Sequence, residues 1–322
     1  MKLLTQIPFH KQENNLLINY NSSILLLGSC FAEHIGEKLE YYKLKNLSNP
    51  FGILFHPLAI KNLVFNAINK KEFSKAHIFL QNEQWHCFDA HSRLDSTSKE
   101  LLIETLNQQN KLVLDQLETS THLIITLGTA WVYRFLKTNE VVANCHKVAQ
   151  KEFSKELLSV TEIIEILSEI YSMVKGINPI CKIIFTISPV RHLKDGFIEN
   201  TRSKAHLIAA VHQFINLQSE IGSQQLFYFP SYEIIMDELR DYRFYNEDLL
   251  HPNPIAVNYI WQKFQETWFS EEAISFSKRI EAVQKSLNHK PFNAESKAHK
   301  IFLENLDQEK TQIKAFFRHI SF

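Results

Sequence analysis

The stretch L-L-L-G-S-C-F-A, residues 25–32, decides the fold of this chain. An apolar run ends in Gly28, Ser29 and Cys30 follow, and an amphipathic helical pattern begins directly after them. Ser29 and Cys30 are therefore expected at a strand-to-helix turn, where unpaired N–H groups and the positive end of the helix dipole gather. Such a position lowers the pKa of a thiol and can stabilise an oxyanion, so this turn is the first candidate for chemistry.

Strands and helices are predicted along the rest of the chain as well. Buried strands are predicted at 23–28, 122–127, 182–188 and 226–229, with a short strand at 44–47. Helices are predicted at 31–42, 58–70, 97–119, 156–175, 200–220 and 254–268. Strands without polar alternation, separated by helices, indicate a parallel sheet that is covered on both faces.

The carboxyl ends of these strands carry the reactive residue types. They are Ser29, Cys30, Thr129, Arg191, His192 and Ser231. Because ligands of parallel α/β sheets bind beyond the carboxyl ends of the strands, a binding or catalytic site is expected at this edge.

Two hairpins and a charged tail complete the organisation. Turn residues predict hairpins over 77–88 and 131–144, and the second one leads into Asn144-Cys145-His146-Lys147. Residues 1–269 are expected to form the α/β domain, and residues 270–322 a helical C-terminal extension. The pattern of the extension fits a lid, a dimer contact or simple packing, and the oligomeric state is left open.

The composition excludes several classes of protein. The formal net charge of the 322 residues is zero and no long basic run occurs, which argues against a nucleic-acid partner. Residues 1–8 are unlike a signal peptide and no apolar stretch is long enough to cross a bilayer, so no membrane partner is expected. The four cysteines are widely scattered and do not resemble a disulfide framework, which favours the cytoplasm.

Asp248 and His251 lie three residues apart before Pro252 and a predicted helix. This spacing places both side chains on one side of a turn, where the carboxylate can bond one imidazole nitrogen and leave the other as a general base. The alternative is an aspartate that caps the helix beside a surface histidine.

Several blocks of the sequence resemble a known family. G-S-C-F-A at 28–32 matches the motif that names the GSCFA domain family, which is similar to the SGNH/GDSL hydrolases. Further matching blocks are N-P-F-G at 49–52, T-L-G-T-A at 126–130, N-C-H-K at 144–147, S-P-V-R-H at 188–192 and D-x-x-H at 248–251. The resemblance implies a three-layer α/β/α, flavodoxin-like domain with ester-hydrolase or acyl-transfer chemistry and no cofactor.

The resemblance also implies roles for individual residues. The SGNH pattern begins with glycine, aspartate and a nucleophilic serine, and when it is laid from Gly28 the place of that serine falls on Cys30. Ser29 remains the nucleophile if the turn is shifted by one residue. Asp248 and His251 match the aspartate and histidine of the hydrolases without departure.

The expected oxyanion hole is less complete. Gly52 resembles the glycine whose N–H donates to the oxyanion, alongside the N–H groups of residues 29–30. The family asparagine that should follow Gly128 by two residues is replaced by Ala130. Asn144 and Thr129 are the candidates to replace that donor.

Two other groups of residues have an ambiguous pattern. Arg191 and His192 could bind a carboxylate or phosphate of the substrate, or form a salt bridge at the end of a strand. Cys145 and His146, with Cys87, His86 and His91, lack the spacing of known metal motifs, so no metal site is predicted.

The expected function is therefore hydrolysis of an ester, such as an O-acylated carbohydrate, through an acyl-enzyme. The partner would be a small-molecule or glycan ester. An O-acyltransferase differs only in the acceptor, and a non-catalytic module that retains the fold is favoured by Ala130.

Overall fold

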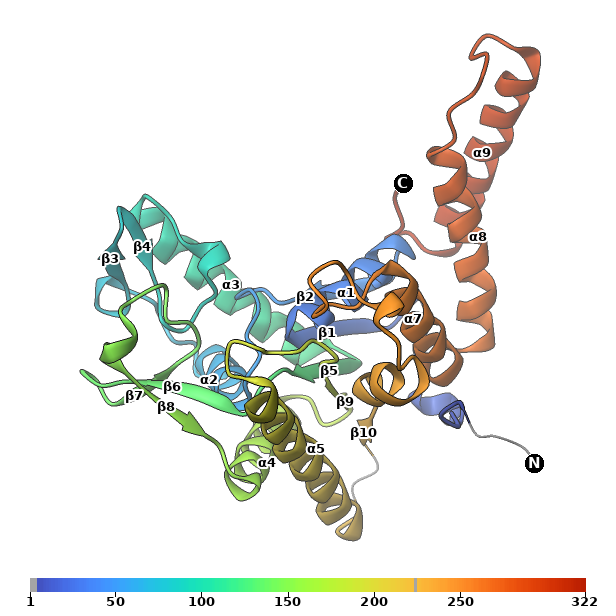
Figure 1. Cartoon of the computed structure of the whole chain (residues 1–322). Coiled ribbons are helices and arrows are strands. Elements are labelled where there is room, and N and C mark those ends of the chain that lie inside the picture. Colours follow the sequence, from blue (N-terminus) through green and yellow to red (C-terminus); the bar gives the residue numbers. More distant parts are fainter. Residues whose placement is uncertain (1–4, 223–224) are drawn as a thin grey trace.

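The computed structural model describes residues 5–222 and 225–322, and a five-stranded parallel sheet forms its centre (Figure 1). The strands are β1 (Ser23–Gly28), β2 (Lys45–Ser48), β5 (His122–Leu127), β9 (Lys182–Ile187) and β10 (Leu226–Tyr228). They lie in the order β10-β9-β5-β1-β2, which is the flavodoxin-like arrangement, with its switch point between β1 and β5. Of residues 1–8, which were predicted not to be a signal peptide, the first four lie outside the described residues.

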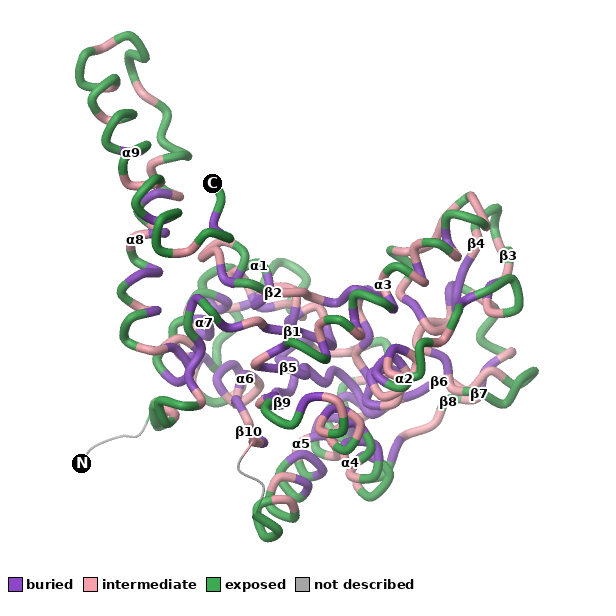
Figure 2. The backbone as a smooth tube through the Cα atoms, turned by 180° about the vertical axis from the view of Figure 1, so that it is seen from behind, coloured by how far each residue is buried: buried purple, intermediate pink, exposed green. Residues whose placement is uncertain are grey.

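The central strands of the sheet contribute to two hydrophobic cores, one on each face. In β1, Leu25 and Leu27 lie in one core while Ile24 and Leu26 lie in the other, and Figure 2 shows the central strands as mostly buried. One face is covered by α2 (Pro57–Ile68), α3 (Lys99–Thr119), α4 (Val160–Ile177) and α5 (Phe197–Glu220), and the other by α1 (Cys30–Tyr41) and α7 (Pro254–Trp268). The predicted three-layer α/β/α fold is confirmed, because both faces of the sheet need apolar side chains.

The hairpins form as predicted, with one addition. β3 (Phe79–Gln81) pairs antiparallel with β4 (Gln84–His86), and β6 (Trp131–Phe135) pairs antiparallel with β7 (Glu140–Val142). The addition is β8 (Phe153–Leu157), which pairs with β6 and takes the place of the first residues of the helix predicted at 156–175. That helix begins only at Val160, because Ser159 and Glu162 form a capping box there.

Short turns of helix join the larger elements. They are η1 (Asn14–Leu16), η2 (Lys75–His77), η3 (Ser92–Leu94), η4 (Gln150–Glu152), α6 (Ser231–Glu233), the π-helical η5 (Ile234–Glu238) and η6 (Tyr242–Phe244).

The C-terminal extension is a helical hairpin of α8 (Glu271–Leu287) and α9 (Lys297–Phe316) that projects from the domain (Figure 1). Its base is part of the main fold, because the ring of Tyr20 lies 4.8 Å from that of Phe276 and 5.2 Å from that of Phe317. The hydrophobic core on the α1 face therefore continues past residue 269 into the extension.

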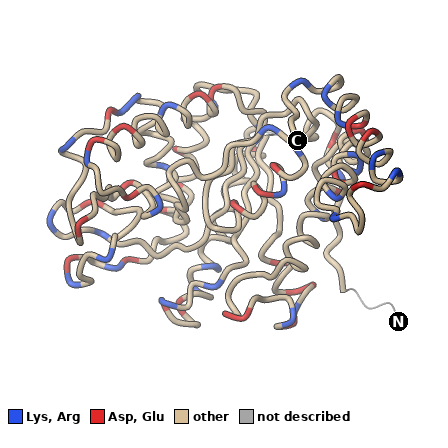
Figure 3. The backbone as a smooth tube through the Cα atoms, turned by 90° about the horizontal axis from the view of Figure 1, so that it is seen from above, with Lys and Arg blue, Asp and Glu red and all other residues tan. Residues whose placement is uncertain are grey.

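Lys and Arg positions alternate with Asp and Glu positions along the backbone seen in Figure 3. Among the described helices, none combines the length and the apolar composition that crossing a bilayer requires.

Candidate active site at the carboxyl ends of the strands

The turn between β1 and α1 has the predicted form. Gly28 has φ of +140°, and a Cβ there would lie 2.1 Å from the carbonyl oxygen of Thr126, so only glycine allows β1 to approach β5 this closely. Ser29 is the N-cap of α1 and Cys30 is its first residue. The turn lies at the β1/β5 switch point, where doubly wound sheets bind their ligands.

The structure distinguishes the two candidate nucleophiles. Ser29 is only 1% exposed, and its Oγ accepts the Phe31 N–H at 3.2 Å as the helix cap. Its own N–H donates to the Thr126 carbonyl at 3.0 Å, so this N–H is already used. Cys30 is half-buried and has a free thiol. The chemistry of the turn therefore points to Cys30.

The pKa of the Cys30 thiol differs from the expectation. Burial raises this pKa, and the Glu33 carboxylate one turn along α1 raises it further, whereas the ammonium group of Lys204 lowers it. The sequence predicted a lowered pKa from the helix N-terminus alone, and that prediction is wrong because it left out burial and Glu33. Cys30 therefore needs a base to remove its proton.

Lys204 is a site residue that the sequence analysis missed. It lies on α5, is 1% exposed, and its Nζ donates to the carbonyl oxygens of Gly128 at 2.7 Å and Ser188 at 2.6 Å. Burial lowers the pKa of Lys204 to about 7, with Cys30 acting in the opposite direction. The signal in the sequence was a lysine on the apolar face of a helix, between Ser203 and Leu207, both of which are buried.

Asp248 and His251 form the predicted pair. The Nδ1–H of His251 donates to Asp248 Oδ2 at 2.6 Å, while Asp248 Oδ1 accepts the N–H groups of Leu250 at 2.8 Å and His251 at 3.0 Å. These hydrogen bonds hold the pKa of Asp248 at about 2, so the carboxylate stays ionised. The tautomer leaves His251 Nε2 with a free lone pair, as a general base requires.

His192 follows the end of β9, and its buried imidazole is neutral. Burial lowers its pKa to about 3, and the charges of Lys204 and His251 lower it further. A neutral imidazole supplies no positive charge, so His192 would bind a carboxylate or phosphate only as a hydrogen-bond donor. Its Nε2 is buried without a hydrogen-bond partner among the described residues.

Arg191 keeps its positive charge at the mouth of the site. Its guanidinium lies over the rings of Tyr242 and Tyr245, with its central carbon 5.4 and 4.8 Å from their centroids. These three residues line a cavity of about 200 Å³ that also includes Asp241. Arg191 forms no salt bridge at the strand end among the described residues. Its guanidinium donates instead to the phenol oxygens of Tyr242 and Tyr245.

The other expected oxyanion donors take part in hydrogen bonds within the protein. The Gly52 N–H donates to the Asn49 carbonyl at 2.7 Å, and the Thr129 Oγ1 is within 2.9 Å of Ser203 Oγ. Asn144 lies in the loop after β7, where its Oδ1 accepts the N–H of His146 at 2.9 Å. The Gly52 N–H is therefore already used, whereas the bond of Asn144 engages its oxygen and not its Nδ2 donor.

Asn49 is a donor that the sequence analysis did not single out. Its Oδ1 accepts the Gly28 N–H at 2.8 Å, while its Nδ2 is buried and without a hydrogen-bond partner among the described residues. Arg93 fixes this position by donating to the Asn49 carbonyl at 3.1 Å and to Glu33 Oε1 at 2.7 Å. A buried amide with a free N–H group beside the nucleophile turn is a candidate to bind an oxyanion.

The electrostatic neighbours connect the two halves of the site. The charge of Lys204 acts on the pKa of both Cys30 and His192, and the charge of His251 acts on that of His192. These interactions are pairwise: Lys204 with Cys30, Lys204 with His192, and His251 with His192. The five cysteine and histidine residues weighed as metal ligands do not form a single cluster, although two of the histidines meet elsewhere, around Asp95.

This arrangement defines a doubly wound α/β protein with a free cysteine at its switch point and an Asp–His pair near the C-terminal end of the sheet domain. The chain belongs to the GSCFA family: the family model matches residues 23–264. A second model, described as the C-terminal domain of GSCFA domain proteins, matches residues 280–322. No curated protein matches the chain.

Proposed function

We propose that this protein is an ester hydrolase that uses Cys30 as nucleophile, His251 as general base and Asp248 to orient His251. The observation that carries the proposal is the Asp248–His251 hydrogen bond of 2.6 Å, which prepares a basic nitrogen. The likeness of the motif blocks to SGNH hydrolases supports the same roles. The substrate class is an ester of a small molecule or glycan, such as an O-acylated carbohydrate.

The first half of the reaction forms a thioester. His251 Nε2 takes the proton of the Cys30 thiol while the sulfur attacks the ester carbonyl carbon, whose C=O electrons move onto the oxygen. The N–H of Cys30, in the first turn of α1, and the Nδ2 group of Asn49 are the proposed donors to this oxyanion. When the tetrahedral intermediate collapses, the alcohol leaves with the proton held by His251.

The second half releases the acid. His251 Nε2 takes a proton from water as the water oxygen attacks the thioester carbonyl carbon. When this intermediate collapses, the carbon–sulfur bond breaks, the acid is released and His251 returns the proton to the Cys30 sulfur as a thiol. Because the pKa of Cys30 is raised by burial, the resting enzyme holds a neutral thiol. We therefore assign a proton transfer at each attack, in place of a permanent thiolate–imidazolium pair.

Arg191 and its two tyrosines are proposed to bind the part of the substrate away from the ester. Their cavity combines the guanidinium groups of Arg191 and Arg240 with the carboxylate of Asp241 and two ring faces. Such a surface suits a flat or sugar-like group that carries an acidic substituent. The four free thiols suit a reducing compartment, so we propose the cytoplasm as the place of action.

The test is hydrolysis of p-nitrophenyl acetate by the full chain and by Cys30→Ala and His251→Ala. Each variant is expected to lower kcat/KM by about a hundredfold or more. Cys145→Ala is the matched control, because Cys145 is also a half-buried free thiol. Equal activity in the wild type and His251→Ala would remove the proposed base.

Two further measurements separate the alternatives. Acetyl transfer to sugar acceptors, measured beside hydrolysis, identifies an O-acyltransferase if transfer exceeds hydrolysis. Iodoacetamide labelling of the folded chain tests whether Cys30 is reactive at all. A Cys30 that stays unlabelled while the chain binds acylated sugars would favour a non-catalytic binding module.

A further inference from the structure

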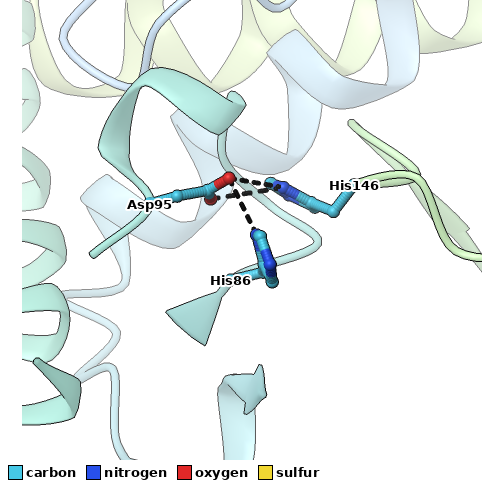
Figure 4. A group of neighbouring side chains, drawn as sticks. All are labelled: His86, Asp95 and His146. Carbon is cyan, nitrogen blue, oxygen red and sulfur yellow. Dashed lines mark hydrogen bonds and ion pairs between the residues drawn. The ribbon is translucent and has the colours of Figure 1, made fainter. Parts of the chain in front are cut away.

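We infer that His86, Asp95 and His146 form a binding site for a divalent transition-metal ion such as zinc. The three side chains converge from separate segments (Figure 4), and their ligand atoms all lie within 4.8 Å of one another. His86 Nδ1 is 2.7 Å from Asp95 Oδ2, and His146 Nδ1 is 3.3 Å from Asp95 Oδ1. Two imidazoles and one carboxylate are a common ligand set for zinc and for non-haem iron.

The tautomers of both histidines prepare the Nδ1 atoms as ligands. His86 Nε2 lies 3.0 Å from the Gln81 carbonyl oxygen, and His146 Nε2 lies 2.7 Å from the Cys87 carbonyl oxygen. A carbonyl oxygen can only accept, so both Nε2 atoms must carry hydrogen. In the neutral imidazoles both Nδ1 atoms then carry a free lone pair, and both atoms face Asp95. Backbone carbonyls commonly orient metal-bound histidines in this way.

The centre of the cluster is short of positive charge. The side chains are nearly closed to solvent, with exposures of 7% for His86, 8% for Asp95 and 0% for His146. The ion pairs described for Asp95 are with these two imidazoles, and His86 Nδ1 has no hydrogen-bond partner among the described residues. Two lone pairs and a buried carboxylate repel one another unless a cation lies between them.

The backbone around His146 is bent to place this imidazole. His146 and Lys147 have φ of +46° and +60°, a region that residues other than glycine seldom adopt. Asn144 stabilises the bend, because its Oδ1 accepts the His146 N–H at 2.9 Å. Strain of this kind persists where the surrounding structure needs the side chain in one position.

A metal here would join two neighbouring segments to a loop about fifty residues further along the chain. His86 lies on β4, Asp95 lies between η3 and α3, and His146 lies in the loop after β7. Three protein ligands leave at least one coordination position for water or another ligand. The inference does not depend on the proposed hydrolysis, because none of these residues has a role in it.

The sequence predicted no metal site, since the spacing of its histidines and cysteines matches no known motif. The proposed site departs from that prediction because its third ligand is Asp95 and the cysteines take no part. Cys87 contributes only its carbonyl oxygen. Ligands on separate loops have no fixed spacing, so only the fold brings them together.

The test measures metal on the full chain, with zinc and cobalt as probes. After treatment with EDTA and dialysis against zinc, the wild type is expected to retain about one ion per chain. Zinc should raise the melting temperature by several degrees, and cobalt should give visible d–d absorption. These readouts need no activity.

Variants show whether the ion sits in this cluster. Asp95→Asn keeps the shape of the side chain and removes its charge, and it is expected to weaken zinc binding by about a hundredfold or more. His91→Gln is the control, because His91 lies in the same loop and accepts the Arg93 N–H without touching Asp95. Unchanged binding by Asp95→Asn would overturn the site. The site would also be overturned if the wild type retained no metal and melted at the same temperature with and without zinc. In that case Asp95 and the two imidazoles would share a proton and bind no metal.

Discussion

Lys204 has an unusual position for its residue type. Its ammonium group is buried between the carboxyl ends of β5 and β9 and is held by two carbonyl oxygens. Its charge also lowers the pKa of Cys30, against burial and Glu33. Lys204 therefore joins the ends of two strands and makes the Cys30 thiol, the proposed nucleophile, easier to ionise.

Replacing Lys204 tests this electrostatic role. In Lys204→Met the pKa of Cys30 should rise, so alkylation of Cys30 by iodoacetamide at pH 8 should slow by several-fold. The two carbonyl oxygens lose their donor, which should also cost about 1–3 kcal/mol in the free energy of unfolding. Alkylation measured against pH separates the two effects, because a purely structural role would leave the midpoint of the profile in place.

Asp248 offers a second test at the residue scale. Asp248→Asn can still accept the N–H groups of the turn, but it no longer holds the tautomer of His251 by its charge. We expect kcat on p-nitrophenyl acetate to fall by about 10²–10⁴-fold with little change in melting temperature. Full activity in this variant would show that His251 is not oriented by Asp248.

Among the helices, α2 has a titratable cap. His56 is the N-cap residue: its Nδ1 accepts the Ala59 N–H at 3.1 Å, and its Nε2 donates to the Val142 carbonyl at 3.1 Å. Complete burial lowers the pKa of His56 to about 4. Protonation would place an N–H against the Ala59 N–H and remove the cap.

This cap should make the stability depend on pH. Between pH 6.5 and 4 the unfolded chain binds more protons at His56 than the folded chain, so the stability falls as the pH falls. His56→Asn keeps a capping side chain and removes the titration. It should reduce the loss of stability between pH 7 and pH 5 by about 1–2 kcal/mol.

Urea unfolding at the two pH values measures this effect. His34→Asn is the control, because His34 is exposed on α1 and its contact is an ion pair with Glu37. If both variants lose the same stability on acidification as the wild type, the cap does not titrate in this range.

In the whole molecule, the C-terminal extension is anchored by a few buried side chains. Ile313 on α9 is fully buried in the core on the α1 face, whereas Ile301 on the same helix is 47% exposed. Ile313→Ala should therefore lower the free energy of unfolding by about 2–4 kcal/mol, and Ile301→Ala by much less. Thermal or urea unfolding of the two variants gives the comparison.

The same pair of variants examines the role of the extension. If α9 only completes the core, Ile313→Ala keeps its hydrolytic activity at temperatures well below its melting point. A loss of kcat in the folded variant would instead indicate that the extension takes part in the reaction as a lid.

The local features of this protein were determined by its sequence. The unalternating strands and the G-S-C-F-A turn predicted the parallel sheet and the strand-to-helix turn that carries Cys30, because hydrophobic periodicity and glycine act over a few residues. The Asp248–His251 pair was predictable for the same reason, since three residues of spacing fix their contact within one turn.

The tertiary structure alone decided what depends on distant contacts. It buried Lys204, raised the pKa of Cys30, made His192 neutral and engaged the Gly52 N–H in a hydrogen bond with the Asn49 carbonyl. It also brought His86, Asp95 and His146 around one point. Burial and long-range charge set these properties, and both depend on which segments meet in space, which spacing along the chain does not encode.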